Sequence, residues 1–333
     1  MNAIFHSRLK IWFGLVLAFS FLVACTAQVE QPAEPDSVTL QLSWLHYGAF
    51  GGFYAADQNG LYADENLTVS FLEGGPAYDP VEAVLAGDAE FGVASADTLV
   101  LARANGKPVR AVATVLRTSP AVLITLGDSG ITHPKDLVGK EVRMTTQIAP
   151  SFHAMMASVG IPPEDYLEVD LPSELDLFVS GEVPVWGVYY NSFAVAIQEA
   201  GYELNFIFPQ DFGVRAYGDV IFTTDALIED DPDLVTRFLR ASLAGWQFAI
   251  EEPEAIGEMV TQYDDTADAQ LESAKMEASI PLIHTGRDYI GWMQMEHWQM
   301  LVETLRQEDI LSAPLTVDDV FTMTFLHDIY GEQ

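Results

Sequence analysis

Cysteine and basic residues are scarce in this chain. Its 333 residues include one cysteine, Cys25, and 15 lysines and arginines against 49 aspartates and glutamates, a formal charge of −34. A single cysteine excludes a disulfide scaffold and any site in which several cysteines hold zinc or an iron–sulfur cluster. The shortage of basic residues makes nucleic acid a poor partner, because binding to phosphates depends on clustered lysines and arginines.

Common motifs of catalysis and cofactor binding are also missing from the sequence. It has no HExxH pair, no GxGxxG element and no Walker A loop, so we expect neither a metal centre nor a bound cofactor. The tetrapeptide GDSG at 127–130 matches the surroundings of a serine-protease nucleophile. Because the flanking sequence has an α/β pattern and no disulfide is available, we interpret Ser129 as a turn residue rather than the nucleophile of a hydrolase.

The beginning of the sequence has the pattern of an export signal. Arg8 and Lys10 precede an uncharged apolar run at 11–24, which at 14 residues is shorter than a bilayer span of roughly 20. The run ends in LVAC (22–25), which resembles a bacterial lipobox whose cysteine receives lipid. We therefore predict a lipoprotein signal peptide at 1–24, lipidation of Cys25, a flexible tether at 25–37 and a lipid anchor on the extracytoplasmic face of the cell membrane.

Apolar strand patterns and helical patterns alternate from residue 38 onward. Apolar residues make up 49% of the chain, which is ample material for a packed core. The alternation is typical of parallel or mixed sheets flanked by helices. Strands are predicted at 38–42, 67–72, 90–94, 109–116, 120–126, 140–144, 167–170, 185–189, 204–208 and 219–223. Helices are predicted between these strands and, after residue 224, at 233–250, 254–262, 268–279, 289–307 and 317–329.

We interpret this pattern as two α/β lobes, the second inserted into the first. The first lobe would comprise 38–119 and 214–333, including a helical C-terminal part, and the second lobe would comprise 120–213. The two chain crossings near 116–123 and 209–218 would then form a hinge beside a cleft. Small ligands commonly bind in clefts between domains.

Aromatic residues gather directly after two predicted strands. Trp44, Tyr47 and Phe50 follow the first strand, and Trp186 and Tyr190 lie at the end of the strand at 185–189. Carboxyl ends of parallel strands are common ligand sites, so we expect these rings to face the cleft and to hold a flat ligand between the lobes. The neighbouring rings of Phe53, Tyr54 and Phe193 are expected in the core.

Few cations are placed to bind an anionic ligand in the cleft. Only Arg117 and Arg215 lie near the predicted crossings. A binder of phosphate, sulfonate or dicarboxylate would normally supply more convergent donors. The inventory therefore favours a mainly neutral, planar, hydrogen-bonding solute.

A set of short segments resembles one known family. The segments are LSW (42–44), GGFYAA (51–56), GLY (60–62), GDAEFGV (87–93), ARANGKPV (102–109), DLVGK (136–140), RFLRA (237–241) and GW (245–246). In this order the chain resembles the solute-binding lipoproteins of ABC importers that are related to binders of thiamine pyrimidine precursors and to pyrimidine synthases. FGGF (50–53), WGVYYN (186–191) and PQDFGV (209–214) are most similar to the riboflavin-binding branch.

The resemblance implies a type II periplasmic-binding-protein fold, an ABC permease as partner and no enzymatic activity. It implies that Trp44, Tyr190 and Asn191 lie in ligand-contacting segments. The chain departs from the synthases in having no cysteine-rich iron-binding run, and from the pyrimidine binders in carrying Phe193 where they have glutamate.

The leading hypothesis is a receptor that binds riboflavin. Trp44 and Tyr190 would stack on the flavin, while the polar side chains of Asn191, Gln147, Asp97 and Asp211 would hydrogen-bond its edge or its ribityl hydroxyls. A formylated aminopyrimidine or an alkanesulfonate remains an alternative ligand, and an anionic one would require Arg117 or Arg215. A pyrimidine synthase or a serine hydrolase is the alternative of a different class.

Overall fold

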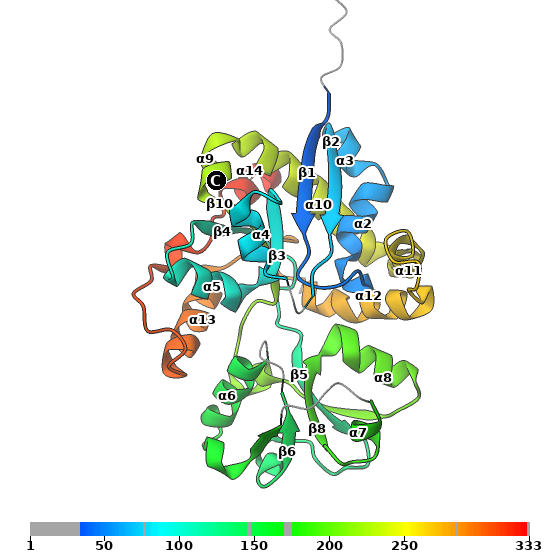
Figure 1. The fold of residues 1–333 in the computed structure, drawn as a ribbon, viewed down its shortest axis with the longest axis vertical. Coiled ribbons are helices and arrows are strands. Elements are labelled where there is room, and N and C mark those ends of the chain that lie inside the picture. The colour runs from blue at the N-terminus through cyan, green and yellow to red at the C-terminus, as the bar shows by residue number, and fades with distance from the viewer. Residues whose placement is uncertain (1–33, 76–77, 145–147, 170–174, 284–285, 332–333) are drawn as a thin grey trace, which may run out of the picture. The chain divides into compact units, whose positions relative to one another are not determined.

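The computed structural model describes residues 34–75, 78–144, 148–169, 175–283 and 286–331. Residues 35–333 belong to one compact unit, which contains two five-stranded sheets, one in each of two lobes (Figure 1). The predicted signal peptide and Cys25 lie outside the described residues. The first strand begins at Asp36, so the predicted tether extends two residues too far into the folded unit.

The first sheet is mixed, with the strand order β2-β1-β3-β10-β4. Strand β1 runs parallel to β2 and β3, whereas β10 enters between β3 and β4 and runs antiparallel to both. This returning strand follows the second lobe in sequence, so the first lobe is built from both ends of the folded chain. Its strands are β1 (Asp36–Gln41), β2 (Leu67–Leu72), β3 (Phe91–Ser95), β4 (Val109–Thr114) and β10 (Asp219–Thr224).

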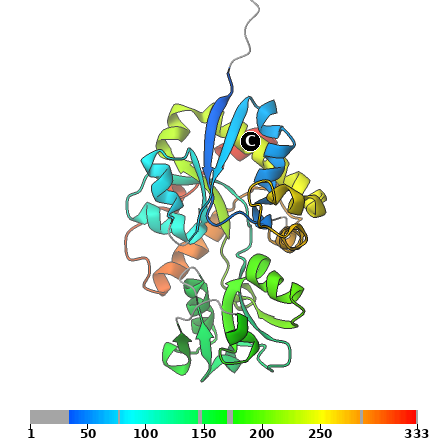
Figure 2. The same cartoon turned by 45° about the vertical axis from the view of Figure 1, so that its right-hand side comes forward.

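Helices surround the first sheet in both views (Figures 1 and 2). The N-terminal part supplies η1 (Gly48–Phe50), α2 (Gly51–Gln58), α3 (Leu61–Asp64), α4 (Pro80–Ala86) and α5 (Ala96–Ala104). The C-terminal part supplies α9 (Asp225–Asp230), α10 (Pro232–Glu251), α11 (Pro253–Val260), α12 (Ala269–Ile283), α13 (Met295–Gln307), η6 (Val317–Asp319) and α14 (Thr324–Tyr330).

Two glycines let helices α2 and α10 approach each other closely. A Cβ atom added to Gly245 would lie 2.1 Å from the carbonyl oxygen of Gly52, and one added to Gly52 would lie 2.1 Å from the Trp246 ring. Neither distance is compatible with a side chain, so larger residues would force the helices apart. The GGF and GW segments of the sequence therefore fix a helix–helix contact in the first lobe.

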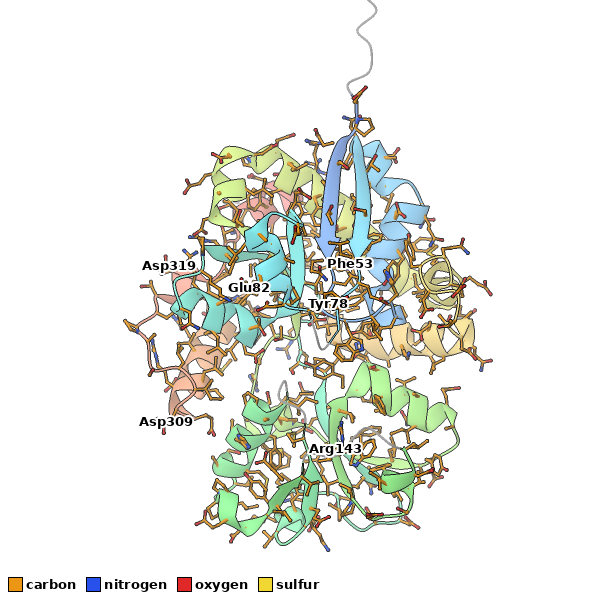
Figure 3. All side chains as sticks on the ribbon, viewed as in Figure 1. Phe53, Tyr78, Glu82, Arg143, Asp309 and Asp319 are labelled. Atoms are coloured by element: carbon orange, nitrogen blue, oxygen red, sulfur yellow. The ribbon has the colours of Figure 1, made fainter. Side chains whose placement is uncertain are left out.

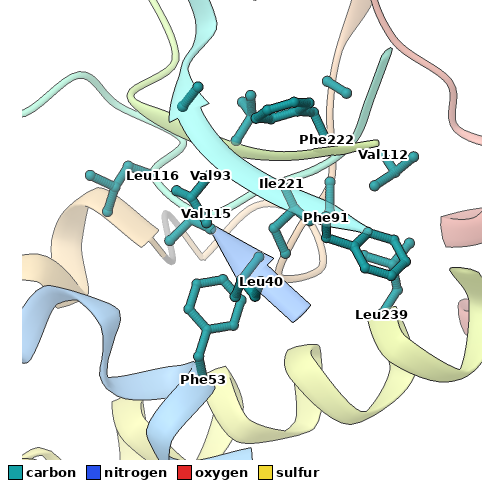
Figure 4. Close-up of a cluster of buried hydrophobic side chains, with 14 of the residues drawn as sticks. Leu40, Phe53, Phe91, Val93, Val112, Val115, Leu116, Ile221, Phe222 and Leu239 are labelled. Carbon is teal, nitrogen blue, oxygen red and sulfur yellow. The ribbon is translucent and has the colours of Figure 1, made fainter. Parts of the chain in front are cut away.

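The core of the first lobe lies between its sheet and helices. Leu40, Phe53 and Ile221 are fully buried there (Figure 4). The Phe91 and Phe238 rings stack with centroids 4.0 Å apart and join β3 to α10. The core thus includes elements from both chain segments of the lobe.

The second lobe has its own sheet, with the order β7-β6-β8-β5-β9. Its strands are β5 (Ala121–Leu126), β6 (Glu141–Arg143), β7 (Leu167–Val169), β8 (Val185–Tyr189) and β9 (Leu204–Ile207). Its helices are η2 (Pro134–Leu137), α6 (Ala149–Ser158), η3 (Pro163–Asp165), α7 (Leu175–Val179), the π-helical turn η4 (Tyr190–Ala194), α8 (Val195–Glu199) and η5 (Pro209–Phe212). Separate apolar clusters pack around Phe152 and around Trp186. Figure 3 shows Arg143 inside this lobe and Phe53 inside the other.

The chain crosses between the lobes twice. The first crossing, at 115–120, joins β4 to β5, and the second crossing, at 208–218, joins β9 to β10. These crossings will be called the hinge. The lobes also meet where α12 contacts α8 and η4.

Two predicted helices begin or end differently in the structure. The helix predicted at 289–307 begins only at Met295, because Gly291 has a left-handed φ of +87° and its carbonyl accepts a hydrogen bond from the Thr114 amide. The helix predicted at 317–329 is interrupted because Phe321 pairs with Ala111 beside β4. In both cases a contact with the first sheet overrides the helical pattern. Among the described residues, no helix is long and apolar enough to cross a membrane.

Candidate functional site

A narrow cavity lies in the cleft between the lobes. It is formed where the carboxyl end of β3, the start of α5, the end of β8 and the start of β10 come together. Its volume is about 30 Å³, room for about one water molecule. The polar and ionisable residues on its wall are Ser95, Asp97, Ser119, Ser151, Tyr189, Arg215, Tyr217, Asp219 and Thr304.

Two carboxyl groups of the first lobe face this cleft. Burial raises the pKa of Asp97 above its ordinary value, although hydrogen bonds from Ser95 and from backbone amides oppose the change. Burial also raises the pKa of Asp219 to about 6, and the negative charge of Asp97 adds to this increase. The Ser43 hydroxyl donates a hydrogen bond to Asp219, at 3.3 Å. The two carboxyls therefore form a pair that favours hydrogen-bond donors or positive charge.

Tyrosines from both lobes complete the polar cluster. Burial raises the pKa of Tyr47 in the first lobe and of Tyr189 in the second, and the charge of Asp219 contributes to both increases. Both hydroxyls therefore stay protonated at neutral pH and can donate or accept hydrogen bonds. Tyr47, Asp97, Tyr189 and Asp219 will be called the cleft cluster.

A hydrogen bond between the lobes lies beside η4. Asn191 is fully buried, and its Nδ2 donates to the Ser279 hydroxyl of α12 at 2.8 Å. The Ser279 hydroxyl in turn donates to the Lys275 carbonyl oxygen. The Oδ1 of Asn191 has no hydrogen-bond partner among the described residues. Asn191 therefore joins the lobes in this conformation and keeps one buried acceptor available.

The predicted aromatic residues have different environments. Trp44 is 39% exposed, whereas Tyr47 is buried in the cleft cluster. Tyr190 is half-buried, with its ring against Phe206 and Phe208 of its own lobe. Trp44 and Tyr190 make no ring contact with each other in the described part of the chain. The prediction that they hold a ligand between them stays a prediction.

Phe50 and Trp186 need correction as ligand-contacting residues. Both side chains are 0% exposed. Phe50 packs edge-on against Tyr47 in the core of the first lobe, and Trp186 packs on Phe178 beneath the Arg143 guanidinium. Their strand-end positions suggested the cleft, but their side chains point into the cores.

The remaining predicted residues lie beside a second cavity or outside the described residues. Arg117 is buried and forms an ion pair with Asp288 at 2.6 Å. Asp211 is exposed on η5. Both line the second cavity rather than the cleft, and Gln147 lies outside the described residues.

The second cavity, which we call the hinge cavity, has a volume of about 430 Å³. It is bounded by both crossings, by Ser151 of α6 and by the segment that leads into α13. Ser119, Ser151, Val214, Arg215 and Ala216 also line the cleft, so the two cavities share a wall. Its other residues are Arg117, Thr118, Ala121, Pro209, Gln210, Asp211, Arg287, Gln294 and His297.

Sequence reasoning missed Tyr189 and Asp219 in the cleft and Arg287 and His297 in the hinge cavity. Tyr189 was recognised only as part of an aromatic run, and Asp219 only as the start of a strand. Their signal was position, because each stands at the end of a strand that faces the other lobe. Arg287 and His297 precede or begin a helix far along the chain, and only the fold brings them to the hinge.

Ser129 takes part in a turn rather than in a catalytic arrangement. Its hydroxyl donates to the Thr125 hydroxyl at 3.1 Å and accepts from the Ile131 amide at 3.2 Å. No histidine hydrogen-bonds to it within the described residues. The arrangement matches the interpretation of GDSG as a turn.

Comparisons with known proteins place this geometry in a family. The formylaminopyrimidine-binding protein of Halalkalibacterium halodurans is 26% identical over 319 residues, covering 93% of this chain and 97% of that protein. The riboflavin-binding protein RibY of Chloroflexus aurantiacus is 27% identical over 319 residues, covering 91% and 90%. The crystal structure of the periplasmic aliphatic sulphonate binding protein SsuA from Escherichia coli superposes with a TM-score of 0.70 at 13% identity, covering 86% and 91%.

The structural likeness confirms the predicted fold of two α/β lobes, that of periplasmic binding proteins. The sequence likenesses confirm the predicted family and the resemblance to RibY. Residues 48–256 match the family described as NMT1/THI5 like. This chain therefore belongs to the NMT1/THI5-like family.

Proposed function

We propose that this chain is the extracytoplasmic solute-binding component of an ABC importer and that its ligand is riboflavin. The observation that carries the proposal is the cleft cluster, in which both lobes contribute hydrogen-bonding groups to one buried space. Solute capture between lobes requires such a shared site. The names of the two sequence relatives, a riboflavin-binding protein and a formylaminopyrimidine-binding protein, support a small heteroaromatic ligand.

The chemistry of the cleft cluster favours an uncharged ligand that has many hydrogen-bond donors. Asp97 and Asp219 can accept hydrogen bonds from ribityl hydroxyls or from a ring N–H, and the tyrosine hydroxyls can serve ring carbonyls and nitrogens. An anionic sulfonate in contact with these carboxyls would be repelled. Exposed Trp44 supplies a flat apolar surface near the end of β1.

The lobes must separate to admit a flavin. A cavity of about 30 Å³ is far smaller than a tricyclic ring. The hinge provides the means of separation, because 115–120 and 208–218 are the only covalent connections between the two sheets in the described structure. Binding would then rejoin Asn191 and Ser279 over the ligand.

A formylated aminopyrimidine is the second candidate ligand. The specific observation in its favour is the carboxyl pair, since a carboxyl group can accept a hydrogen bond from an exocyclic amine while it pairs with a ring nitrogen. A pyrimidine synthase is disfavoured because the sequence has no cysteine after Cys25 to supply the iron-binding run of that branch.

Fluorescence titration tests the proposal directly. Riboflavin emission should be quenched on binding to the purified protein, with a dissociation constant of roughly 1 μM or tighter. Calorimetry with the aminopyrimidine and with an alkanesulfonate provides the comparison. If riboflavin shows no quenching and no affinity better than ~100 μM, the flavin is excluded. Binding of the aminopyrimidine alone would then select the second candidate.

The location proposal rests on the sequence around Cys25. We propose that lipid on this cysteine holds the protein at the membrane beside an ABC permease. Metabolic labelling with radioactive palmitate should mark the wild-type protein, whereas Cys25→Ser should lose the label and leave the membrane fraction. Retention of label in Cys25→Ser would contradict the lipid anchor.

A further inference from the structure

The hinge cavity collects positive charge in a strongly acidic protein. Most of the ion pairs among the described residues lie away from this cavity. They join Arg103 and Arg110 to Asp225, Lys107 to Glu82, Arg237 to Asp36 and Asp233, Arg240 to Glu65, and Lys275 to Glu272. Arg215 and Arg287 line the hinge cavity, and no described carboxylate lies within 4.0 Å of either guanidinium. Two uncompensated arginines therefore converge on one concave space.

Other charged groups around the cavity leave a net positive balance. Arg117 is compensated by Asp288, which also accepts a hydrogen bond from Gln294. Asp211 lies on the wall as an exposed carboxylate. His297 also lines the cavity. Burial lowers its pKa most, the charges of Arg117 and Arg215 lower it further, and those of Glu296 and Asp288 oppose the change.

Uncharged donors complete the lining. Gln210, Thr118, Ser119 and Ser151 reach the cavity from both crossings and from α6. Amide and hydroxyl groups of this kind can donate to oxyanions, and arginine binds phosphate through two parallel N–H groups. These donors together are typical of a site that binds a small, multiply charged oxyanion.

We propose that the hinge cavity binds an oxyanion of the phosphate class, held by Arg215 and Arg287. The anion can come from two sources. It can be free phosphate, or it can be the phosphate group of a solute whose ring lies in the cleft, because the cleft and the hinge cavity share the wall that carries Arg215. The volume of about 430 Å³ accommodates either source.

The position of the site links anion binding to lobe movement. Arg215 lies on the second crossing, and Thr118 and Ser119 lie on the first. An anion that contacts both crossings would favour one hinge angle over others. The second source rests on the proposed function, whereas the first does not depend on any ligand in the cleft.

Calorimetric titration of the full chain tests the site. The probes are inorganic phosphate, riboflavin and its phosphate ester, flavin mononucleotide. Arg215→Gln and Arg287→Gln should each weaken binding of the phosphate-bearing probe by about tenfold or more. Lys140→Gln is the matched control, because Lys140 is an exposed cation of the second lobe without a carboxylate partner among the described residues. Thermal melts check that every variant is folded, and Arg287→Lys should retain part of the affinity.

The outcomes separate the sources of the anion. Arginine-dependent binding of inorganic phosphate supports a site for free anion, and arginine-dependent binding of flavin mononucleotide alone supports a site for the phosphate group of the solute. The proposal is overturned if neither probe binds more tightly than ~10 mM, or if Lys140→Gln weakens binding as much as the arginine variants. If riboflavin does not bind, the proposal of a flavin ligand fails. The titration with inorganic phosphate still tests the hinge cavity, because it does not depend on a ligand in the cleft.

Discussion

The cleft and the hinge cavity share the wall that carries Arg215 but differ in their other charged groups. The cleft adds two carboxyl groups, Asp97 and Asp219, whereas the hinge cavity adds Arg287, and neither arginine has a carboxylate partner among the described residues. In a chain with 49 acidic and 15 basic residues, the cleft follows the average composition and the hinge cavity departs from it. The difference teaches that the net charge of the chain does not predict the ligand preference of a particular cavity.

The largest expected effect comes from removing the two carboxyl groups of the cleft. Replacing both Asp97 and Asp219 by alanine should weaken riboflavin binding by about 100-fold or more, because each charged hydrogen bond contributes roughly 1.5–3 kcal/mol. Phosphate affinity in the hinge cavity should change little. Fluorescence and calorimetric titrations measure the two affinities.

Asp211→Asn is the matched control for that double variant. It removes an exposed carboxylate that lines the hinge cavity, so riboflavin affinity should be unchanged and phosphate affinity should increase. An equal loss of riboflavin affinity in Asp211→Asn would contradict the assignment of the carboxyl pair to the ligand.

The next effect concerns the contact that holds the cleft shut. Asn191→Ala removes the hydrogen bond to Ser279 and should destabilise the closed conformation by about 1–3 kcal/mol. Riboflavin affinity should fall by roughly fivefold to 150-fold. Small-angle scattering should show a more open average conformation. Ser192→Ala, a change at the adjacent half-buried position, is the control. Unchanged affinity in Asn191→Ala would show that the two lobes close without this contact.

Acid should affect the two cavities with opposite sign. The pKa of Asp219 is raised from 3.8 to about 6, so the folded state binds a proton more readily than the unfolded state between these values. This group therefore increases the free energy of unfolding as pH falls from about 6 toward about 4. The pKa of His297 is lowered from 6.5, so this group decreases the free energy of unfolding as pH falls through 6.5.

Urea unfolding of single variants across this pH range measures both contributions. Asp219→Asn should stabilise the protein by about 1–2 kcal/mol at pH 7 and lose that advantage in acid. His297→Gln should show a growing advantage as the pH is lowered. The contrast between the two cavities would be contradicted if the stability differences of both variants changed in the same direction as the pH is lowered.

The smallest expected effect concerns the exposed ring of Trp44, which follows β1. Trp44→Ala should weaken riboflavin binding by roughly threefold to tenfold, since an aromatic contact contributes about 0.5–1.5 kcal/mol beyond area burial. Leu45→Ala is the neighbouring control, because Leu45 is also exposed and apolar but cannot stack. Equal effects in both variants would assign the loss to apolar burial rather than to stacking. Phosphate affinity should be unchanged in both.

Much of the fold could be predicted from local sequence patterns. The strand at 67–72 and the strand at 185–189 have the predicted bounds. Gly60 and Gly87 follow helices and have a left-handed φ, as is common for glycines at that position. Helix limits after residue 284 were less accurate, because contacts of Gly291 and Phe321 with the first sheet determine them.

The candidate sites were harder to predict than the fold. Strand-end position selected Tyr47, which lies near Asp219 and Tyr189, but it also selected Phe50 and Trp186, whose side chains turn into the cores. The alternation of side chains along a strand predicts which face of the sheet a ring lies on, but not how deeply that ring is buried. The hinge cavity is lined by both Arg117 and Arg287, which lie 170 residues apart in sequence (287 − 117), so no local pattern could have revealed it.

The central place of β10 in the first sheet has a consequence for synthesis. This strand separates β3 from β4, and it is made only after every strand of the second sheet. Chain growth is directional, and nearby segments pair before distant ones. The second lobe can therefore complete its sheet before β10 has been synthesised. The sheet of the first lobe cannot be completed until the chain has been made as far as Thr224, the last residue of β10.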